Sequence, residues 1–110
     1  MSDVSPTGSI SPENYKAYRK DFAKSADLMQ KSLEMYNKTS EYNKKEQLKK
    51  TMNEAMTIMN QIVKVALKKN EQSMEKKLVK DYDTYINSAN AKNYKAVRAD
   101  LDDLQDSVKS

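Results

Sequence analysis

The sequence predicts an all-α protein, an antiparallel helical bundle of three or four helices with a disordered N-terminal leader. Three observations lead to this prediction. The single glycine and both prolines of the 110 residues lie within the first twelve positions, so the rest of the chain lacks the residues that form β-turns. Charged residues make up 33% of the chain and hydrophobic residues 37%, a ratio typical of amphipathic helices. Apolar residues recur at spacings of three and four, which is the period of an α-helix.

A chain of this length is expected to form one domain. Residues 1–10 are polar, rich in Ser and Thr, and lack an apolar period, so we expect a disordered leader there. Residues 11–110 are expected to form the single bundle domain.

The first helix is expected near residues 12–37. Ser11 is a good N-cap, Pro12 suits the first helical position because its missing N–H costs nothing there, and Glu13 faces the positive end of the helix dipole. Apolar residues then form one stripe: Tyr15, Tyr18, Phe22, Ala26, Met29, Leu33 and Tyr36. The short polar residues 37–40 end this stripe and can cap the next helix.

The segment 41–88 holds the most apolar stretch of the chain, which we expect at the centre of the core. Its apolar stripe continues in phase to residue 86 with no glycine or proline to stop it. Two helices near 41–69 and 71–88, with a break near Lys69–Ser73, fit this pattern. One helix of about 45 residues, roughly 70 Å long, fits it as well. We favour the break.

The last helix is expected near residues 91–108, after the capping cluster 87–90. Its apolar positions alternate strictly by three and four: Tyr94, Val97, Leu101, Leu104 and Val108. Such a narrow stripe predicts packing against one or two neighbours at most. Because the first two helices are longer than the last two, part of the long pair would be left uncovered. A homodimer that buries this surplus is therefore one hypothesis.

The chain contains neither histidine nor cysteine, which removes the commonest catalytic and metal-binding side chains. Asp102 and Asp106 share a helix face, but no calcium-loop pattern or third fixed ligand accompanies them, so we interpret them as a solvated flank. We predict no catalytic residues, no cofactor and no metal. The protein is not expected to be an enzyme.

Methionines at helical spacing suggest a surface that could adapt to a partner. Met29, Met52, Met56 and Met59 are the candidate partner-binding residues, although filling the core is the commoner role of such a pattern. On this basis we expect a non-enzymatic protein–protein interaction module: an adaptor, a chaperone-like protein or an assembly subunit. Its partner would be another protein or a second copy of the chain.

Positive charge is concentrated in the middle of the chain, where residues 38–80 carry eleven bases against five acids. The candidate basic stripe consists of Lys45, Lys49, Lys64 and Lys68. Only Arg19 and Arg98 of the twenty bases are arginine, so base-reading side chains are scarce. The alternative function is therefore that of a nonspecific nucleic-acid-associated protein. A solvated lysine face is the simpler interpretation.

A cytoplasmic location is expected, because the chain starts without a basic, apolar signal peptide and never reaches eighteen consecutive apolar residues. Export without a Sec signal is the alternative. Small helical proteins of this length without a signal peptide include the WXG-type secreted proteins and the needle proteins or chaperones of type III secretion. The chain has no tryptophan and no W-x-G turn, so no motif supports membership in these families. A link to a bacterial secretion system is kept as an open alternative.

Overall fold

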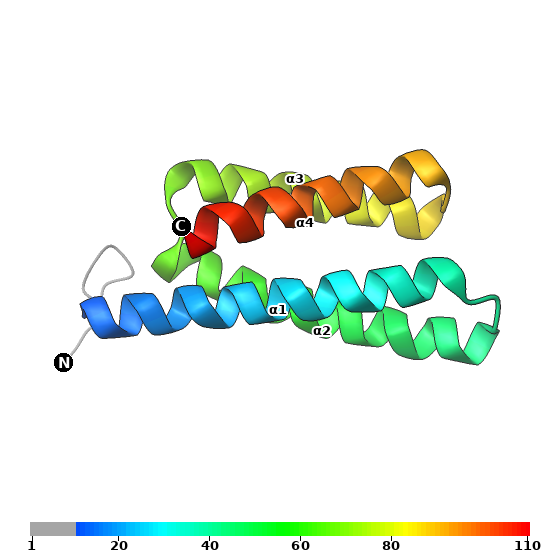
Figure 1. Ribbon diagram of the computed structural model, residues 1–110, viewed down its shortest axis with the longest axis horizontal. Helices are drawn as coiled ribbons and strands as arrows, with labels where there is room; N and C mark the ends of the chain where they lie inside the picture. Colours follow the sequence, from blue (N-terminus) through cyan, green and yellow to red (C-terminus); the bar gives the residue numbers. More distant parts are fainter. Residues whose placement is uncertain (1–10) are drawn as a thin grey trace.

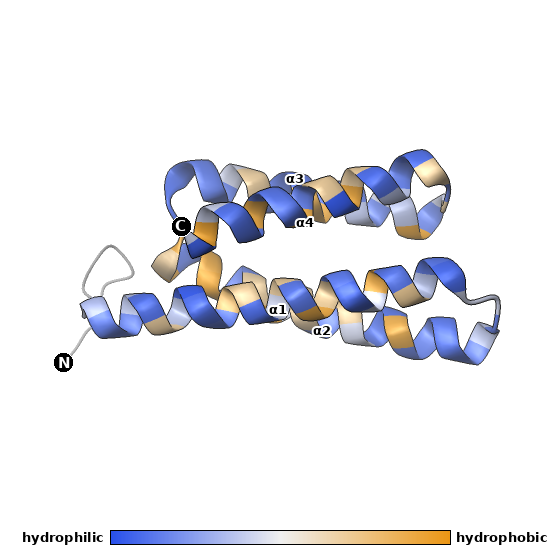
Figure 2. Cartoon of the chain, in the orientation of Figure 1, coloured by the Kyte–Doolittle hydropathy of each residue, from blue (hydrophilic) through white to orange (hydrophobic). Residues whose placement is uncertain are grey.

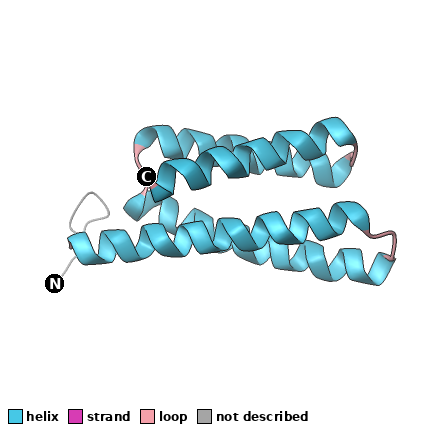
Figure 3. Ribbon diagram, in the orientation of Figure 1, coloured by secondary structure: helices cyan, strands magenta, loops and turns pink. Residues whose placement is uncertain are grey.

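A computed structural model describes residues 11–110, which fold into four α-helices (Figure 1). They are α1 (Pro12–Lys38), α2 (Tyr42–Ala66), α3 (Lys69–Asn87) and α4 (Ala91–Lys109). The described residues contain no β-strand (Figure 3), so the all-α prediction is confirmed. The predicted leader, residues 1–10, lies outside the described residues.

The starts of α1 and α4 follow from local sequence. The Ser11 hydroxyl accepts a hydrogen bond from the Asn14 N–H at 3.2 Å, and Pro12 takes the first helical position. At the start of α4, Asn90 Oδ1 accepts from the Asn93 N–H at 2.8 Å. Both boundaries agree with the capping residues predicted from the sequence.

The segment 41–88 forms two helices rather than one long rod. The backbone is extended at Leu67, with φ −110° and ψ 143°, and at Lys68, with φ −70° and ψ 162°. The break therefore comes slightly before the predicted position of Lys69–Ser73. The Glu71 carboxylate accepts a hydrogen bond from the Lys68 N–H at 2.9 Å, which satisfies a free donor at the helix start and begins α3 at Lys69.

The helices form two antiparallel hairpins that lie one above the other (Figure 1). α1 packs along α2, α3 along α4, and α1 also along α4, whereas the contact between α2 and α3 is the least extensive of these pairs. The bundle measures 49 × 24 × 21 Å. Because α1 and α2 contain 27 and 25 residues against 19 in each of α3 and α4, the first hairpin extends beyond the second at both ends (Figure 1).

The core lies between the two hairpins, and each helix contributes one buried stripe to it. Figure 2 shows hydrophobic and hydrophilic residues alternating along every helix, as this arrangement requires. The fully buried apolar side chains include Phe22, Met29, Leu33, Met52, Met59, Leu78, Tyr85, Val97, Leu101 and Leu104. The narrow stripe of α4 packs against two neighbours, α1 and α3, in agreement with its predicted role. Within residues 11–110 no helix has the length and apolar character needed to cross a bilayer.

The two ends of the bundle are closed by different chemistry. At the end that holds the α1–α2 and α3–α4 connections, the ring of Tyr85 lies 5.9 Å from that of Tyr36 and 6.1 Å from that of Tyr94, measured between centroids. The Tyr85 hydroxyl donates to Asn37 Oδ1 at 2.8 Å, and burial raises its pKa to about 12. At the opposite end, where α2 leads into α3, a charged pair is buried instead.

Candidate binding grooves and a buried ion pair

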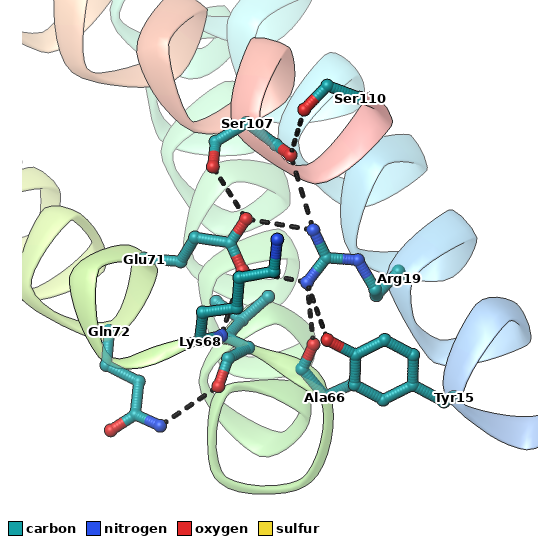
Figure 4. Close-up of polar contacts among 9 residues, drawn as sticks. Tyr15, Arg19, Ala66, Lys68, Glu71, Gln72, Ser107 and Ser110 are labelled. Atoms are coloured by element: carbon teal, nitrogen blue, oxygen red, sulfur yellow. Dashed lines mark hydrogen bonds and ion pairs between the residues drawn. The ribbon is translucent and has the colours of Figure 1, made fainter. Parts of the chain in front are cut away.

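Arg19 of α1 and Glu71 of α3 form a bidentate ion pair inside the bundle (Figure 4). Arg19 Nη1 lies 2.7 Å from Glu71 Oε1, and Nη2 lies 2.8 Å from Oε2. The Glu71 side chain is fully buried and that of Arg19 is 10% exposed. Parallel N–H to carboxylate bonds of this kind are the strongest that an arginine makes.

Groups from all four helices surround this pair, as Figure 4 shows. The guanidinium donates to the carbonyl oxygen of Ala66 at 2.9 Å and to that of Ser107 at 3.3 Å. The Ser107 hydroxyl donates to Glu71 Oε2 at 2.6 Å. The Ala66 carbonyl belongs to the last turn of α2 and has no partner within that helix, so Arg19 supplies the missing donor.

The pKa shifts of Arg19 and Glu71 both favour the charged forms, as expected for a structural ion pair. The hydrogen bond from Arg19 lowers the pKa of Glu71 to about 2, and this effect outweighs the burial that raises it. The hydrogen bond to Glu71 likewise raises the pKa of Arg19. Both groups therefore stay charged across the physiological range, and neither is poised to transfer a proton.

A groove of about 770 Å³ lies beside Arg19, between α1, the α2–α3 connection and the end of α4. Its apolar lining comes from Tyr15, Ala23 and Val108. Five lysines line it as well, and we call this feature the basic groove: Lys16, Lys20, Lys24, Lys68 and Lys109. Asp27 is the one acidic side chain in the lining, and it pairs with Lys31 at 3.1 Å.

A second groove, of about 630 Å³, runs between α1 and α2. Tyr18 lines it from α1, and Ile58 and Val65 line it from α2. Leu28 and Met35, which are 47% and 53% exposed, lie on the same stripe of α1 because positions 18, 21, 25, 28, 32 and 35 alternate by three and four. We call the surface formed by Tyr18, Leu28, Met35, Ile58 and Val65 the α1–α2 seam.

A second polar cluster joins α3 to α4. Lys77 Nζ lies 2.8 Å from Asp81 Oδ2 and 2.9 Å from Asp100 Oδ1. Burial raises the pKa of Asp100 to about 6, and its contact with Asp81 adds to the effect. Burial also raises the pKa of Glu75, a neighbour on the buried stripe of α3. In the part of the chain that the structure describes, no group of three or more carboxylates is placed to hold a metal ion.

Of the four methionines predicted as partner-binding residues, three are buried and Met56 is partly buried. Met29 and Met52 are fully buried, Met59 is 1% exposed, and Met56 packs against the core from its edge. Their helical spacing therefore reflects core packing in this fold. The exposed apolar surface lies beside this core on the same two helices, at the α1–α2 seam.

The four lysines of the predicted basic stripe do not converge. Lys45 lies over the ring of Tyr36, with Nζ 5.0 Å from its centroid, and Lys49 pairs with Glu46 at 3.3 Å. Lys64 is near the far end of α2, roughly 28 Å from Lys45 by the rise of a helix. Only Lys68 belongs to the basic groove.

Several residues that matter here were not singled out from the sequence: Arg19, Glu71, Lys16, Lys20, Lys24 and Lys109. One signal was present, because both arginines of this lysine-rich chain stand four residues after a tyrosine. Arg19 donates to the Tyr15 hydroxyl at 3.3 Å, and Arg98 donates to that of Tyr94 at 3.1 Å. Each also pairs with a glutamate of another helix, Glu71 or Glu34.

Comparison with known proteins finds no relative of this chain. The chain matches no protein-family model, no curated protein and no solved structure.

Proposed function

We propose that the protein is a non-enzymatic interaction module, acting as an adaptor, a chaperone-like protein or an assembly subunit. Its partner lays an amphipathic helix along the α1–α2 seam. The observation that carries this proposal is the groove between α1 and α2, where Tyr18 is 40% exposed and Ile58 is 44% exposed.

The exposed apolar side chains are concentrated on the first hairpin. Within residues 11–110, six large apolar residues are exposed: five belong to α1 and α2, and Val79 belongs to α3. Single exposed apolar residues are normal on any surface, but a cluster of them is typical of a binding site. Tyr18 and Ile58 line the α1–α2 groove itself, and Leu28 and Met35 continue the stripe of α1 beyond it.

The spacing of these residues favours a helical partner. On α1 they follow the three-four alternation of positions 18 to 35, and on α2 Ile58 and Val65 are one heptad apart. A stripe of this kind is what a helix buries against another helix. A partner with apolar residues at the same period would fill the seam.

The placement of the titratable groups favours binding over catalysis. The carboxylates with strongly altered pKa values are Glu71, Glu75 and Asp100, and none of them lines the basic groove or the α1–α2 groove. A general acid or base must reach a bound substrate.

The test compares three forms of the protein: wild type, Ile58→Lys in the seam and Val79→Lys on α3 as a matched control. A second copy as partner would double the molar mass measured by light scattering at low and at high salt. Another protein as partner would be captured by the immobilised chain and identified by mass spectrometry. We expect Ile58→Lys to abolish the interaction and Val79→Lys to keep it. An interaction unchanged by Ile58→Lys, with circular dichroism like that of wild type, would exclude the seam.

A further inference from the structure

The lysines of the basic groove are arranged in a line. Lys16, Lys20 and Lys24 follow one another at intervals of four residues along α1, so each step rises about 6 Å and the row is about 12 Å long. Lys68 and Lys109 line the same groove from the α2–α3 connection and the end of α4. Charges from three separate parts of the chain thus meet at one concave surface.

The fold makes no use of this charge. None of the five lysines forms an ion pair with another residue of the described range 11–110. The neighbouring charges are already paired, Arg19 with Glu71 and Asp27 with Lys31. Lysines four residues apart repel one another, and Lys16 stands near the positive end of the α1 dipole. Repulsion within this row lowers the stability of the protein slightly, and a bound anion would relieve it.

We propose that the basic groove binds the phosphate backbone of a single-stranded nucleic acid. A line of cations matches a linear polyanion better than a compact one, and the row is long enough for two or three successive phosphates. The free cations are all lysines, which bind phosphates as point charges, whereas a carboxylate is matched best by the fork of an arginine. In the apolar lining Ala23 and Val108 are buried, so the half-buried Tyr15 offers the main surface for a sugar or base.

This geometry predicts binding without sequence preference. No free arginine faces the groove, because Arg19 is held by Glu71 and Ala66, so the usual bidentate contact to guanine is missing. The basic groove shares one lining residue, Lys24, with the α1–α2 groove. The variants Ile58→Lys and Lys68→Gln/Lys109→Gln each alter one groove alone, so the two proposals can still fail independently.

The first experiment measures the affinity of the full chain for fluorescein-labelled dT12 by fluorescence anisotropy over a range of salt concentrations. We expect log K to fall linearly with log salt, with a slope of up to about −3.5 if all five lysines contact phosphates. Absence of binding at low salt, or binding that does not depend on salt, would overturn the proposal.

Two variants that remove the same number of charges distinguish the effect of the basic groove from the effect of net charge. The variant Lys16→Gln/Lys20→Gln/Lys24→Gln removes three charges from the groove, and Lys44→Gln/Lys50→Gln/Lys64→Gln removes three from exposed positions of α2. Glutamine keeps the helix propensity of lysine. We expect the groove variant to lose at least tenfold in affinity and about 2 in the magnitude of the salt slope. The control should change by less than about threefold. Equal losses would show that only net charge acts.

Two further measurements serve as controls, one for misfolding of the α1 variant and one for the chemical class of the ligand. Lys68→Gln/Lys109→Gln alters the groove outside α1 and should weaken binding of dT12 even if the α1 variant fails to fold. Unlabelled polyglutamate of equal charge serves as competitor. Displacement of dT12 by polyglutamate as effective as that by unlabelled dT12 would mean that the groove prefers an acidic peptide, which would overturn the assignment to nucleic acid.

Discussion

At the scale of single residues, the two arginines show how burial determines the contribution of an ion pair to the stability of the fold. Arg19 and Arg98 have the same local surroundings, with a tyrosine one turn earlier and a glutamate on another helix. The Glu71 partner of Arg19 is fully buried, whereas the side chains of Arg98 and Glu34 are 33% and 36% exposed. Solvent can replace the second contact but not the first.

We therefore expect Arg19→Met to lower the free energy of unfolding by about 3–5 kcal/mol, because it leaves Glu71 charged, buried and unpaired. The matched variant Arg98→Met should cost about 0–1 kcal/mol. Urea unfolding followed by circular dichroism measures both. The double variant Arg19→Met/Glu71→Met should recover much of the loss, since no charge is then left alone. Equal costs for the two single variants would contradict this account.

Two buried acids give the stability a pH dependence with opposite signs. The pKa of Glu71 is about 2 in the folded protein against an ordinary value of 4.5, so the unfolded chain binds a proton first and stability falls as the pH drops from about 4.5 to 2. The pKa of Asp100 is raised to about 6 from 3.8, so the folded protein binds the proton first. Stability should therefore rise as the pH drops from about 6 to 4, and the raised pKa of Glu75 acts in the same direction.

The measurement is the free energy of unfolding by urea between pH 2 and pH 7. We expect a rise on the order of 1 kcal/mol from pH 7 to pH 4, followed by a fall on the order of 3 kcal/mol below it. Asp100→Asn should reduce the rise and leave the fall, whereas Glu71→Gln should reduce the fall and leave the rise. A profile that keeps its shape in both variants would show that other groups control it.

At the scale of the elements, the helix ends differ in what holds them. The start of α4 depends on local contacts, since Asn90 caps it through Asn93 three residues later. The end of α2 depends on distant residues, because the Ala66 carbonyl is bound by Arg19 and the Leu67 carbonyl accepts from Gln72 Nε2 at 3.1 Å. Substitutions at the two places should therefore act differently.

For the local cap, Asn90→Ala should lower the free energy of unfolding by about 1 kcal/mol, because the Asn93 N–H loses its acceptor. In a chain of this size the change corresponds to a fall in Tm of about 4–8 °C, which thermal unfolding would detect. Asn90→Asp keeps the acceptor and serves as the control. A similar loss in both variants would show that the side-chain cap contributes nothing.

At the scale of the whole molecule, the two hairpins share one core but leave one face of α1 and α2 open. Met52 of α2 is fully buried in this core, whereas Met35 of α1 lies on the α1–α2 seam and is 53% exposed. The same residue type therefore has a packing role at one position and a surface role at the other.

Replacing each methionine by alanine tests this difference. Met52→Ala should cost about 2–5 kcal/mol, because it removes buried methylene groups and leaves a cavity. Met35→Ala should change the free energy of unfolding by about 0.5 kcal/mol or less in the monomer. Urea unfolding at low protein concentration measures both. A large cost at Met35 that grows with protein concentration would instead indicate that a second copy covers the seam.

Sequence alone determined the features that depend on residues close together in the chain. The Ser11-Pro12 start, the Asn87–Asn90 cluster and the three-four alternation of apolar residues place the helices to within a few residues, because caps and amphipathic stripes arise within one or two turns. It also placed Val97, Leu101 and Leu104 in the core, where they are fully buried.

Tertiary structure decided the features that depend on where distant residues meet. The phase of the apolar pattern continues past residue 67, yet the helix breaks there, and the carbonyl that the break leaves free at Ala66 is bound by Arg19, 47 residues earlier. Glu71 is charged and yet occupies a core position. It can do so because the folded bundle brings the guanidinium of Arg19 to its carboxylate, which the sequence does not reveal. The same holds for the basic groove, whose lysines come from α1, the α2–α3 connection and α4. Helical period reports which residues share a face, whereas charge pairing depends on which faces are brought together by the packing of the helices.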